Sequence, residues 1–97
     1  MLVHALGFDG LNEELISLAR DNDLILIEDC CESHGTLHES KLVGSIGDMS
    51  CFSFYFGHHI TTIEGGFVCT NDEKIYQLAK LFRSHGMTRE ASPEIQK

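Results

Sequence analysis

The apolar residues of this chain fall into short runs between polar turns, and their spacing predicts the secondary structure. Four runs rich in branched and aromatic residues predict strands at residues 2–7 (with the exit loop), 24–27, 49–54 and 66–70. The run Leu24–Ile27 contains no polar residue, which is typical of a strand buried on both faces in a parallel sheet. This strand is expected to end at Glu28-Asp29.

Two further stretches have apolar residues at helical spacing and predict amphipathic helices. In the first, Leu11, Leu15 and Leu18 share a face, and Asp21-Asn22-Asp23 stops the helix after about three turns. The second covers residues 75–83. Its N-cap is expected at Asn71-Asp72, and Gly86 follows its last turn.

The order of these elements is strand, helix, strand, loop, strand, strand, helix. This order predicts an α/β fold with a mainly parallel sheet and flanking helices. Residues 35–48 mix glycines with polar residues and are expected to form a surface loop. Ligands of such sheets bind at the carboxyl ends of the strands. Asp29 and the Gly57-His58 turn fall at such ends, so they are candidates for a binding site.

Length and charge narrow the class of protein. A chain of 97 residues forms at most one small domain. Its first residues resemble the middle of a strand and its last residues carry no obvious stop signal, so we expect a fragment of a larger protein. The net charge of -8 disfavours nucleic acid and anionic membranes as partners. No apolar run reaches the roughly 18–20 residues of a membrane-spanning helix. Four cysteines without a C-x-x-C pair predict reduced thiols in a cytoplasmic protein.

Each candidate residue has a functional and a structural interpretation. Asp29 could hold a cation such as a protonated pyridine nitrogen, or it could be a loop or capping acid. Ser53 could donate to a phosphate, or it could be a structural serine of its strand. His58 could act as a general acid or base, or it could be a hydrogen-bonded loop histidine. Adjacent residues on an extended chain point opposite ways, so His59 is not expected to share its task.

A metal-binding module is a further alternative. Cys30, Cys31, His34 and His38 lie close together in the sequence. Their spacing does not match that of zinc fingers, and we therefore expect no metal site.

Several short motifs occur in order along the chain. They are Ile27–Gly35 (IEDCCESHG), Gly44–Asp48 (GSIGD), Phe52–Phe54 (FSF), His58–Gly66 (HHITTIEGG) and Arg83–Gly86 (RSHG). Each is weak alone, but together they resemble the DegT–DnrJ–StrS family of nucleotide-sugar aminotransferases over nearly the whole chain. The resemblance implies that residues 1–97 are part of the large, cofactor-binding domain of a fold-type I, aspartate-aminotransferase-like enzyme. The cofactor implied is pyridoxal 5′-phosphate (PLP), and the N-terminal part and the C-terminal small domain would be absent.

The resemblance also implies roles for single residues. Asp29 matches the aspartate that pairs with the pyridine nitrogen, and Glu32 matches a position beside the cofactor ring oxygen. Ser53 matches a serine on the cofactor phosphate. Aligning the Glu-Gly-Gly of this chain with that of the family puts His58 at the position of the cofactor lysine. His59 then falls on the usual asparagine.

Histidine in place of lysine implies a cofactor that is held without a covalent bond and works as pyridoxamine 5′-phosphate (PMP). This feature resembles the histidine-type sugar 3-dehydrase subgroup of the family. There the histidine removes a proton from the cofactor, and the C3 hydroxyl of a nucleotide-linked 4-keto-6-deoxyhexose leaves. One branch acts on GDP sugars and regenerates PMP from glutamate, and the pair Ile63-Glu64 favours that branch. The other acts on CDP sugars and carries an iron–sulfur cluster. Family members form homodimers.

Two other functions stay open. The first is an ordinary sugar aminotransferase that uses a lysine elsewhere, although Lys41, Lys74 and Lys80 do not have the right spacing. The second is a non-catalytic binding or sensory protein that has lost the lysine on the same fold.

Overall fold

The computed structural model describes residues 1–90 and 92–93. In chain order the strands are β1 (Leu2–Val3), β2 (Ile27–Asp29), β3 (Leu37–His38), β4 (Lys41–Leu42), β5 (Met49–Ser53) and β6 (Gly66–Thr70). The helices are α1 (Glu13–Asp21) and α2 (Glu73–Arg83), with short 3-10 turns at Ala5–Gly7 and Thr88–Glu90. None of the described helices is long and apolar enough to span a membrane.

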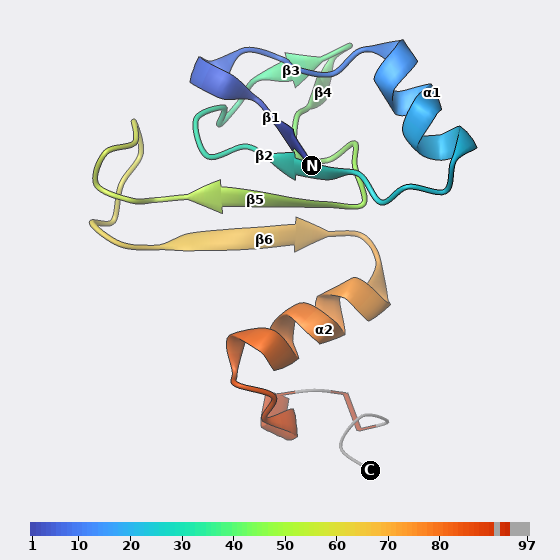
Figure 1. Cartoon of the computed structure of the whole chain (residues 1–97). Helices are drawn as coiled ribbons and strands as arrows, with labels where there is room; N and C mark the ends of the chain where they lie inside the picture. Colours follow the sequence, from blue (N-terminus) through green and yellow to red (C-terminus); the bar gives the residue numbers. More distant parts are fainter. Residues whose placement is uncertain (91, 94–97) are drawn as a thin grey trace.

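The main sheet has four strands in the order β1-β2-β5-β6 (Figure 1). Strands β1, β2 and β5 are parallel, and β6 pairs antiparallel with β5. The parallel part is built through the crossovers that the α/β order predicts, whereas β5 and β6 are joined by a long hairpin loop. The prediction of an α/β fold with a mainly parallel sheet is therefore confirmed.

Both predicted helices form, and side chains cap them. The Asn12 side chain accepts a hydrogen bond from the Leu15 amide at the start of α1. Asp72 caps α2 by accepting from the amides of Lys74 and Ile75, at the position that the sequence predicts. Such caps satisfy amide groups that the first helical turn leaves without a partner.

The strand predicted at Leu24–Ile27 lies later in the chain than expected, because β2 covers Ile27–Asp29. Leu24 and Ile25 are 58% and 65% exposed, so the expectation of burial on both faces is wrong for them. The apolar run instead links α1 to the sheet, with the Leu24 amide bonded to the Ala19 carbonyl. Pairing with β1 and β5, and not hydropathy, decides where β2 begins.

The expected surface loop over residues 35–48 contains regular structure. Strands β3 and β4 form a hairpin whose two turn residues, Glu39 and Ser40, both have positive φ angles of 45° and 70°. Two-residue hairpins favour this conformation because its twist matches that of the strands. The sequence does not predict this turn, because neither residue is glycine or asparagine. Val43 directly after the hairpin is 3% exposed, so this segment contributes to the core.

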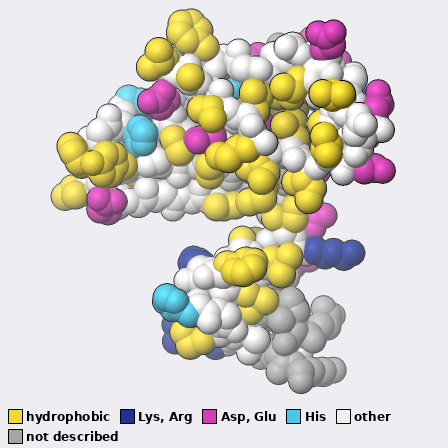
Figure 2. Space-filling model, in the orientation of Figure 1, with side chains coloured by type: hydrophobic (Ala, Val, Ile, Leu, Met, Phe, Trp, Pro, Cys, Tyr) yellow, Lys and Arg dark blue, Asp and Glu magenta, His cyan; other side chains and the backbone are white. Residues whose placement is uncertain are grey.

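The core is small and the sheet is open. Among the described residues the buried apolar side chains are Leu11, Cys30 and Val43. Figure 2 shows apolar side chains spread over the visible surface, around the sheet and on α2. The radius of gyration is 15.0 Å, whereas a compact domain of this length has about 12–13 Å. Much of the apolar surface that this chain presents therefore lies uncovered.

Candidate active site

The register of β2 and β5 assigns the candidate residues to faces of the sheet. Asp29 pairs with Cys51, and partners across a ladder point to the same face. Ser53 lies two residues beyond Cys51 on β5, so it shares that face. Asp29 and Ser53 are the last residues of their parallel strands. A carboxylate and a hydroxyl thus lie on one face at the carboxyl end of the sheet, where α/β folds bind ligands.

Two thiols surround the carboxylate of Asp29. Its Oδ1 accepts a hydrogen bond from the Cys31 amide at 3.1 Å. One carboxylate oxygen of Asp29 and the Sγ atoms of Cys31 and Cys51 all lie within 4.8 Å of one another. Burial, and then the charge of Asp29, raise the pKa of Cys31 to about 12 and also raise the pKa of Cys51. Both thiols therefore stay protonated and neutral beside the carboxylate at neutral pH.

The sequence grouped these cysteines differently. It singled out Cys30, Cys31, His34 and His38 as neighbours, but the side chains of Cys30 and Cys31 lie in different clusters. Cys30 lies with His4 and Glu28, whereas Cys31 lies with Asp29 and Cys51. Cys30 still pairs with β5, because its amide donates to the Cys51 carbonyl at 2.9 Å, whereas Cys31 begins the turn that follows β2.

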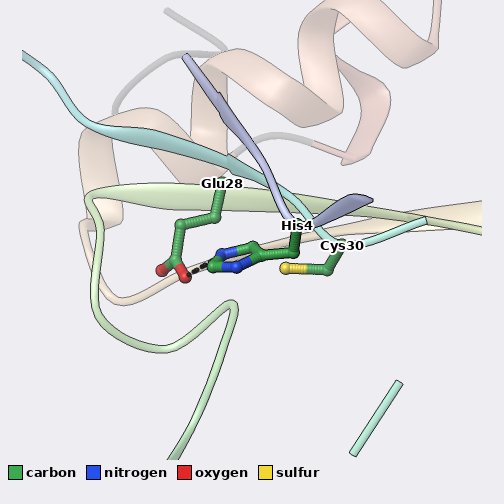
Figure 3. A group of neighbouring side chains, drawn as sticks. All are labelled: His4, Glu28 and Cys30. Carbon is green, nitrogen blue, oxygen red and sulfur yellow. Dashed lines mark hydrogen bonds and ion pairs between the residues drawn. The ribbon is translucent and has the colours of Figure 1, made fainter. Parts of the chain in front are cut away.

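Glu28 is a fully buried carboxylate that the sequence did not single out. Its Oε2 accepts hydrogen bonds from His4 Nε2 at 3.0 Å and from the Gly44 amide at 2.7 Å. Its Oε1 accepts from the amides of Ile46 and Gly47 at 2.9 and 2.6 Å. Figure 3 shows the His4 ring pointing at the Glu28 carboxylate, with Cys30 beside them. Each oxygen thus has two donors, which compensates for the burial of a charge.

Glu28 fixes the loop before β5 and thereby the strand that carries Ser53. Burial alone would raise the pKa of Glu28, but the hydrogen bonds from the loop amides and from His4 outweigh it and lower the pKa. The Gly10 amide donates to His4 Nδ1 at 3.1 Å, so the proton of the neutral ring lies on Nε2 and points at Glu28. An acid within an apolar strand followed by glycines was the available signal for this contact.

His58 lies in the loop that joins β5 to β6. The ends of the loop are tied together, because the Phe54 amide donates to the Gly65 carbonyl at 2.8 Å and the Thr62 amide donates to the Phe54 carbonyl at 3.0 Å. The His58 amide donates to the Tyr55 carbonyl at 3.0 Å, which forms a turn around the histidine. The His58 ring is partly buried and contacts the Tyr55 ring edge-on, with 6.1 Å between centroids.

His59 points to a different group of side chains. It is exposed and meets the ring of His34 edge-on, with 4.7 Å between centroids. His34 also packs on Phe52 and Phe54, and its two ring nitrogens have no hydrogen-bond partner among the described residues. Burial, and then the nearby charges of His59 and His58, lower the pKa of His34. His58 and His59 thus contact different rings, Tyr55 and His34, although both lie near enough to His34 to affect its pKa.

The other two candidates already have backbone partners. Glu32 accepts a hydrogen bond from the Leu6 amide at 2.7 Å, which ties the turn after β2 to the turn after β1. The hydroxyl of Ser53 accepts from the Tyr55 amide at 3.2 Å. The oxygen of Ser53 thereby accepts a bond while its proton remains available to donate.

Comparison with known proteins identifies relatives of this chain. A GDP-4-keto-6-deoxy-D-mannose 3-dehydratase of Escherichia coli O55:H7 is 40% identical over 89 residues, which cover 92% of this chain and 23% of the relative. A GDP-perosamine synthase of Escherichia coli O157:H7 is 41% identical over 87 residues, or 90% of this chain and 24% of the relative.

A solved structure confirms the likeness in three dimensions. The E. coli GDP-4-keto-6-deoxy-D-mannose 3-dehydratase with bound hydrated PLP superposes with a TM-score of 0.84 at 40% identity. The match covers 93% of this chain and 23% of the solved one, so this chain spans about a quarter of its relatives' length. The prediction that the chain has part of an aminotransferase-like PLP fold is therefore confirmed. Residues 1–97 match the DegT/DnrJ/EryC1/StrS aminotransferase family along their whole length, and the chain belongs to that family.

Proposed function

We propose that this chain is part of the large domain of a PLP- and PMP-dependent enzyme that acts on a nucleotide sugar. Its membership of the family and its likeness to an enzyme structure holding hydrated PLP support the cofactor. The chemistry of the donor set also fits. A carboxylate suits a pyridinium nitrogen and a hydroxyl suits a phosphate, and Asp29 and Ser53 offer these groups on one face of the sheet. When bound, the cofactor supplies an electron sink for the reaction.

Each residue has a distinct task in this proposal. The carboxylate of Asp29 keeps a proton on the pyridine nitrogen. The hydroxyl of Ser53 donates to the phosphate, and Glu32 stands beside the ring oxygen while its carboxylate holds the Leu6 amide. The neutral thiols of Cys31 and Cys51 add no charge that would compete with Asp29 for the pyridinium.

The reaction that we propose is removal of the C3 hydroxyl from a nucleotide-linked 4-keto-6-deoxyhexose, with His58 as the base. The observation that carries this proposal is an imidazole in the loop between β5 and β6, at the position that the family resemblance aligns with the cofactor lysine. Imidazole can take and return a proton near neutral pH, which is typically worth about 10²–10⁴-fold in rate. The similarity to a 3-dehydratase over 92% of the chain supports this choice of reaction.

The first experiment is borohydride trapping of the full-length protein loaded with PLP, followed by mass spectrometry. Borohydride converts a lysine-bound cofactor into a permanent adduct, whereas a cofactor held without a covalent bond leaves the protein unmodified. We expect no adduct, together with PMP-dependent dehydration of a 4-keto-6-deoxy sugar. A stoichiometric adduct on one lysine would establish a conventional aminotransferase and make His58 structural.

Substitution of the two neighbouring histidines tests the assigned base directly. We expect His58→Asn to lower dehydration by at least about 10²-fold while PLP binding, followed by its absorbance, stays unchanged. His59→Asn is the matched control, because His59 packs on His34, and it should retain activity within a few-fold. Full activity of the His58→Asn protein would rule out the proposed role.

An aminotransferase is the second candidate, because a GDP-perosamine synthase matches this chain as well as a dehydratase does. The lysines named as candidates lie away from the loop between β5 and β6: Lys41 is on β4, and Lys74 and Lys80 are on α2. The trapping experiment separates these two functions. If no keto-sugar is converted, a non-catalytic binding protein is favoured. Glutamate as amino donor and a homodimer are further parts of the proposal, drawn from the family resemblance.

A further inference from the structure

A group of metal-ligating side chains lies outside the site described above. One carboxylate oxygen each of Glu13 and Glu39 and a ring nitrogen of His38 all lie within 4.8 Å of one another. Glu13 is the first residue of α1, His38 ends β3, and Glu39 is the first turn residue of the hairpin. Figure 1 places the turn between β3 and β4 beside the start of α1. The tertiary fold thus brings together two segments that are distant in sequence.

The orientation of His38 is fixed by a carboxylate behind it. His38 Nδ1 lies 2.6 Å from Asp9 Oδ2, and Asp9 Oδ1 accepts the Leu11 amide at 2.9 Å. An ionised carboxylate can only accept a hydrogen bond, so Nδ1 carries the proton. The lone pair of the neutral ring is then on Nε2.

The Nε2 atom of His38 has no partner in the described part of the chain. It is buried and makes no hydrogen bond, although the side chain as a whole is 12% exposed. A bare ring nitrogen whose opposite N–H is held by a carboxylate is the arrangement found behind metal-ligating histidines. Glu13 and Glu39 are exposed, so a cation between them could complete its coordination with water. The cation would also offset the repulsion between two neighbouring carboxylates.

We propose that Glu13, His38 and Glu39 form a binding site for a divalent transition-metal ion of the Mn²⁺ type, with Asp9 orienting the histidine. Two carboxylate oxygens and one imidazole suit Mn²⁺ better than Ca²⁺, which takes six to eight oxygen ligands. The three ligands leave positions that water fills. The bound ion joins the start of α1 to the β3–β4 hairpin and stabilises the contact between them.

The test is titration of Mn²⁺ into the full-length, cofactor-free protein, followed by electron paramagnetic resonance of the free ion. Cofactor is removed because its phosphate binds metals. Mn²⁺ is chosen because it prefers oxygen and nitrogen to the thiols of the Asp29, Cys31 and Cys51 group. We expect one ion per chain and a rise in the melting temperature with Mn²⁺ concentration.

Variants identify the ligands. Glu39→Gln and Glu13→Gln change exposed side chains and should each weaken Mn²⁺ binding at least tenfold without affecting folding. Asp9→Asn removes the orienting charge and should weaken binding by about 10–100-fold. Glu14→Gln is the matched control, because it removes a neighbouring acid of the same helix turn, and Cys51→Ser controls for the thiol group. Neither control should change the affinity.

Three results would overturn the proposal. The first is no stoichiometric Mn²⁺ binding, which would mean that His38 only forms ion pairs with the surrounding acids. The second is binding that Glu39→Gln and Glu13→Gln leave unchanged. The third is binding that Glu14→Gln weakens equally, which would mean nonspecific attraction to the acidic surface.

Discussion

At the scale of single residues, two carboxylates that are adjacent in the sequence lie in very different environments. Glu28 and Asp29 are neighbours, yet one is fully buried under four hydrogen-bond donors and the other faces two thiols at the end of its strand. Because successive residues of a strand point to opposite faces, one acid can serve the fold while the next serves the proposed cofactor site.

Replacing Glu28 by Gln should destabilise the full-length protein by at least about 3 kcal/mol. The amide keeps the shape, but its NH₂ group faces backbone donors of the loop and leaves them without an acceptor. Urea denaturation measures the change, with Glu14→Gln as the exposed control. A loss of less than about 0.5 kcal/mol, the range of ordinary surface substitutions, would contradict this account.

Glu28 also predicts how stability depends on pH. Its pKa in the folded chain lies below the ordinary value of 4.5, because hydrogen bonds to the ionised form outweigh burial. The unfolded chain therefore takes up the proton at higher pH than the folded chain does. The stabilisation is complete above about pH 4.5 and is lost as the pH falls through the lower folded-state pKa. Denaturation of wild type and Glu28→Gln between about pH 5 and 3 should show a shallower pH dependence in the variant. Equal slopes would argue against this assignment.

At the scale of elements, the segment between β2 and β5 is held by its glycines as well as by Glu28. Gly44 has a φ of +88°, and a Cβ atom there would lie 2.6 Å from Cζ of Phe52 and 3.1 Å from Sγ of Cys30. The Phe52 ring in turn stacks on Phe67 of β6 with 4.6 Å between centroids. The loop, β5 and β6 therefore pack as one unit, and this unit positions Ser53.

Gly44→Ala and Gly35→Ala form a matched pair that separates crowding from backbone strain. Gly35 has a similar φ of +86°, but a Cβ there would meet no atom within 4 Å. Both substitutions force alanine into the left-handed region, at about 1–2 kcal/mol. Gly44→Ala should cost about 1–3 kcal/mol more, because the methyl group must displace the Phe52 ring. Urea denaturation of both full-length variants measures the difference. Equal losses of unfolding free energy would show that the Phe52 ring moves aside without cost.

At the scale of the whole molecule, the chain presents a thin α/β layer with much of its apolar surface uncovered. It extends 42 × 38 × 19 Å, and large apolar side chains such as Phe8, Phe56 and Phe82 are 74%, 65% and 82% exposed. The relatives are about four times as long, and we infer that parts of the whole protein cover these faces. The homodimer and the cytoplasmic location stay predictions.

The 97-residue chain alone should therefore be poorly stable and inactive. Its exposed strand edges and apolar helix faces favour association over a unique fold. Thermal denaturation and binding of a hydrophobic dye, compared with the full-length protein, test this expectation. The isolated chain should melt without a sharp transition, bind the dye strongly and show no tight PLP binding. A cooperative melt with tight PLP binding would contradict the prediction.

The sequence by itself determined the features that depend on nearby residues. The periodicity of the two helices, the cap at Asp72 and the α/β order are local signals, and the structure confirms them. The family motifs can likewise be recognised in the sequence alone, and the comparisons confirm the family. The histidine at position 58 is also visible in the sequence alone, although its role stays a proposal.

Only the tertiary structure decided which distant residues meet. The start of β2 depends on its pairing with β1 and β5, and apolar content alone placed it three residues too early. The contacts of Glu28 with His4 and the loop, of Asp29 with Cys51, and of His38 with Asp9 all cross long stretches of chain. Hydropathy and spacing report how a residue relates to its neighbours in sequence, whereas these contacts depend on strand register and loop closure. For that reason the fold class was predictable, and the polar clusters that it assembles were not.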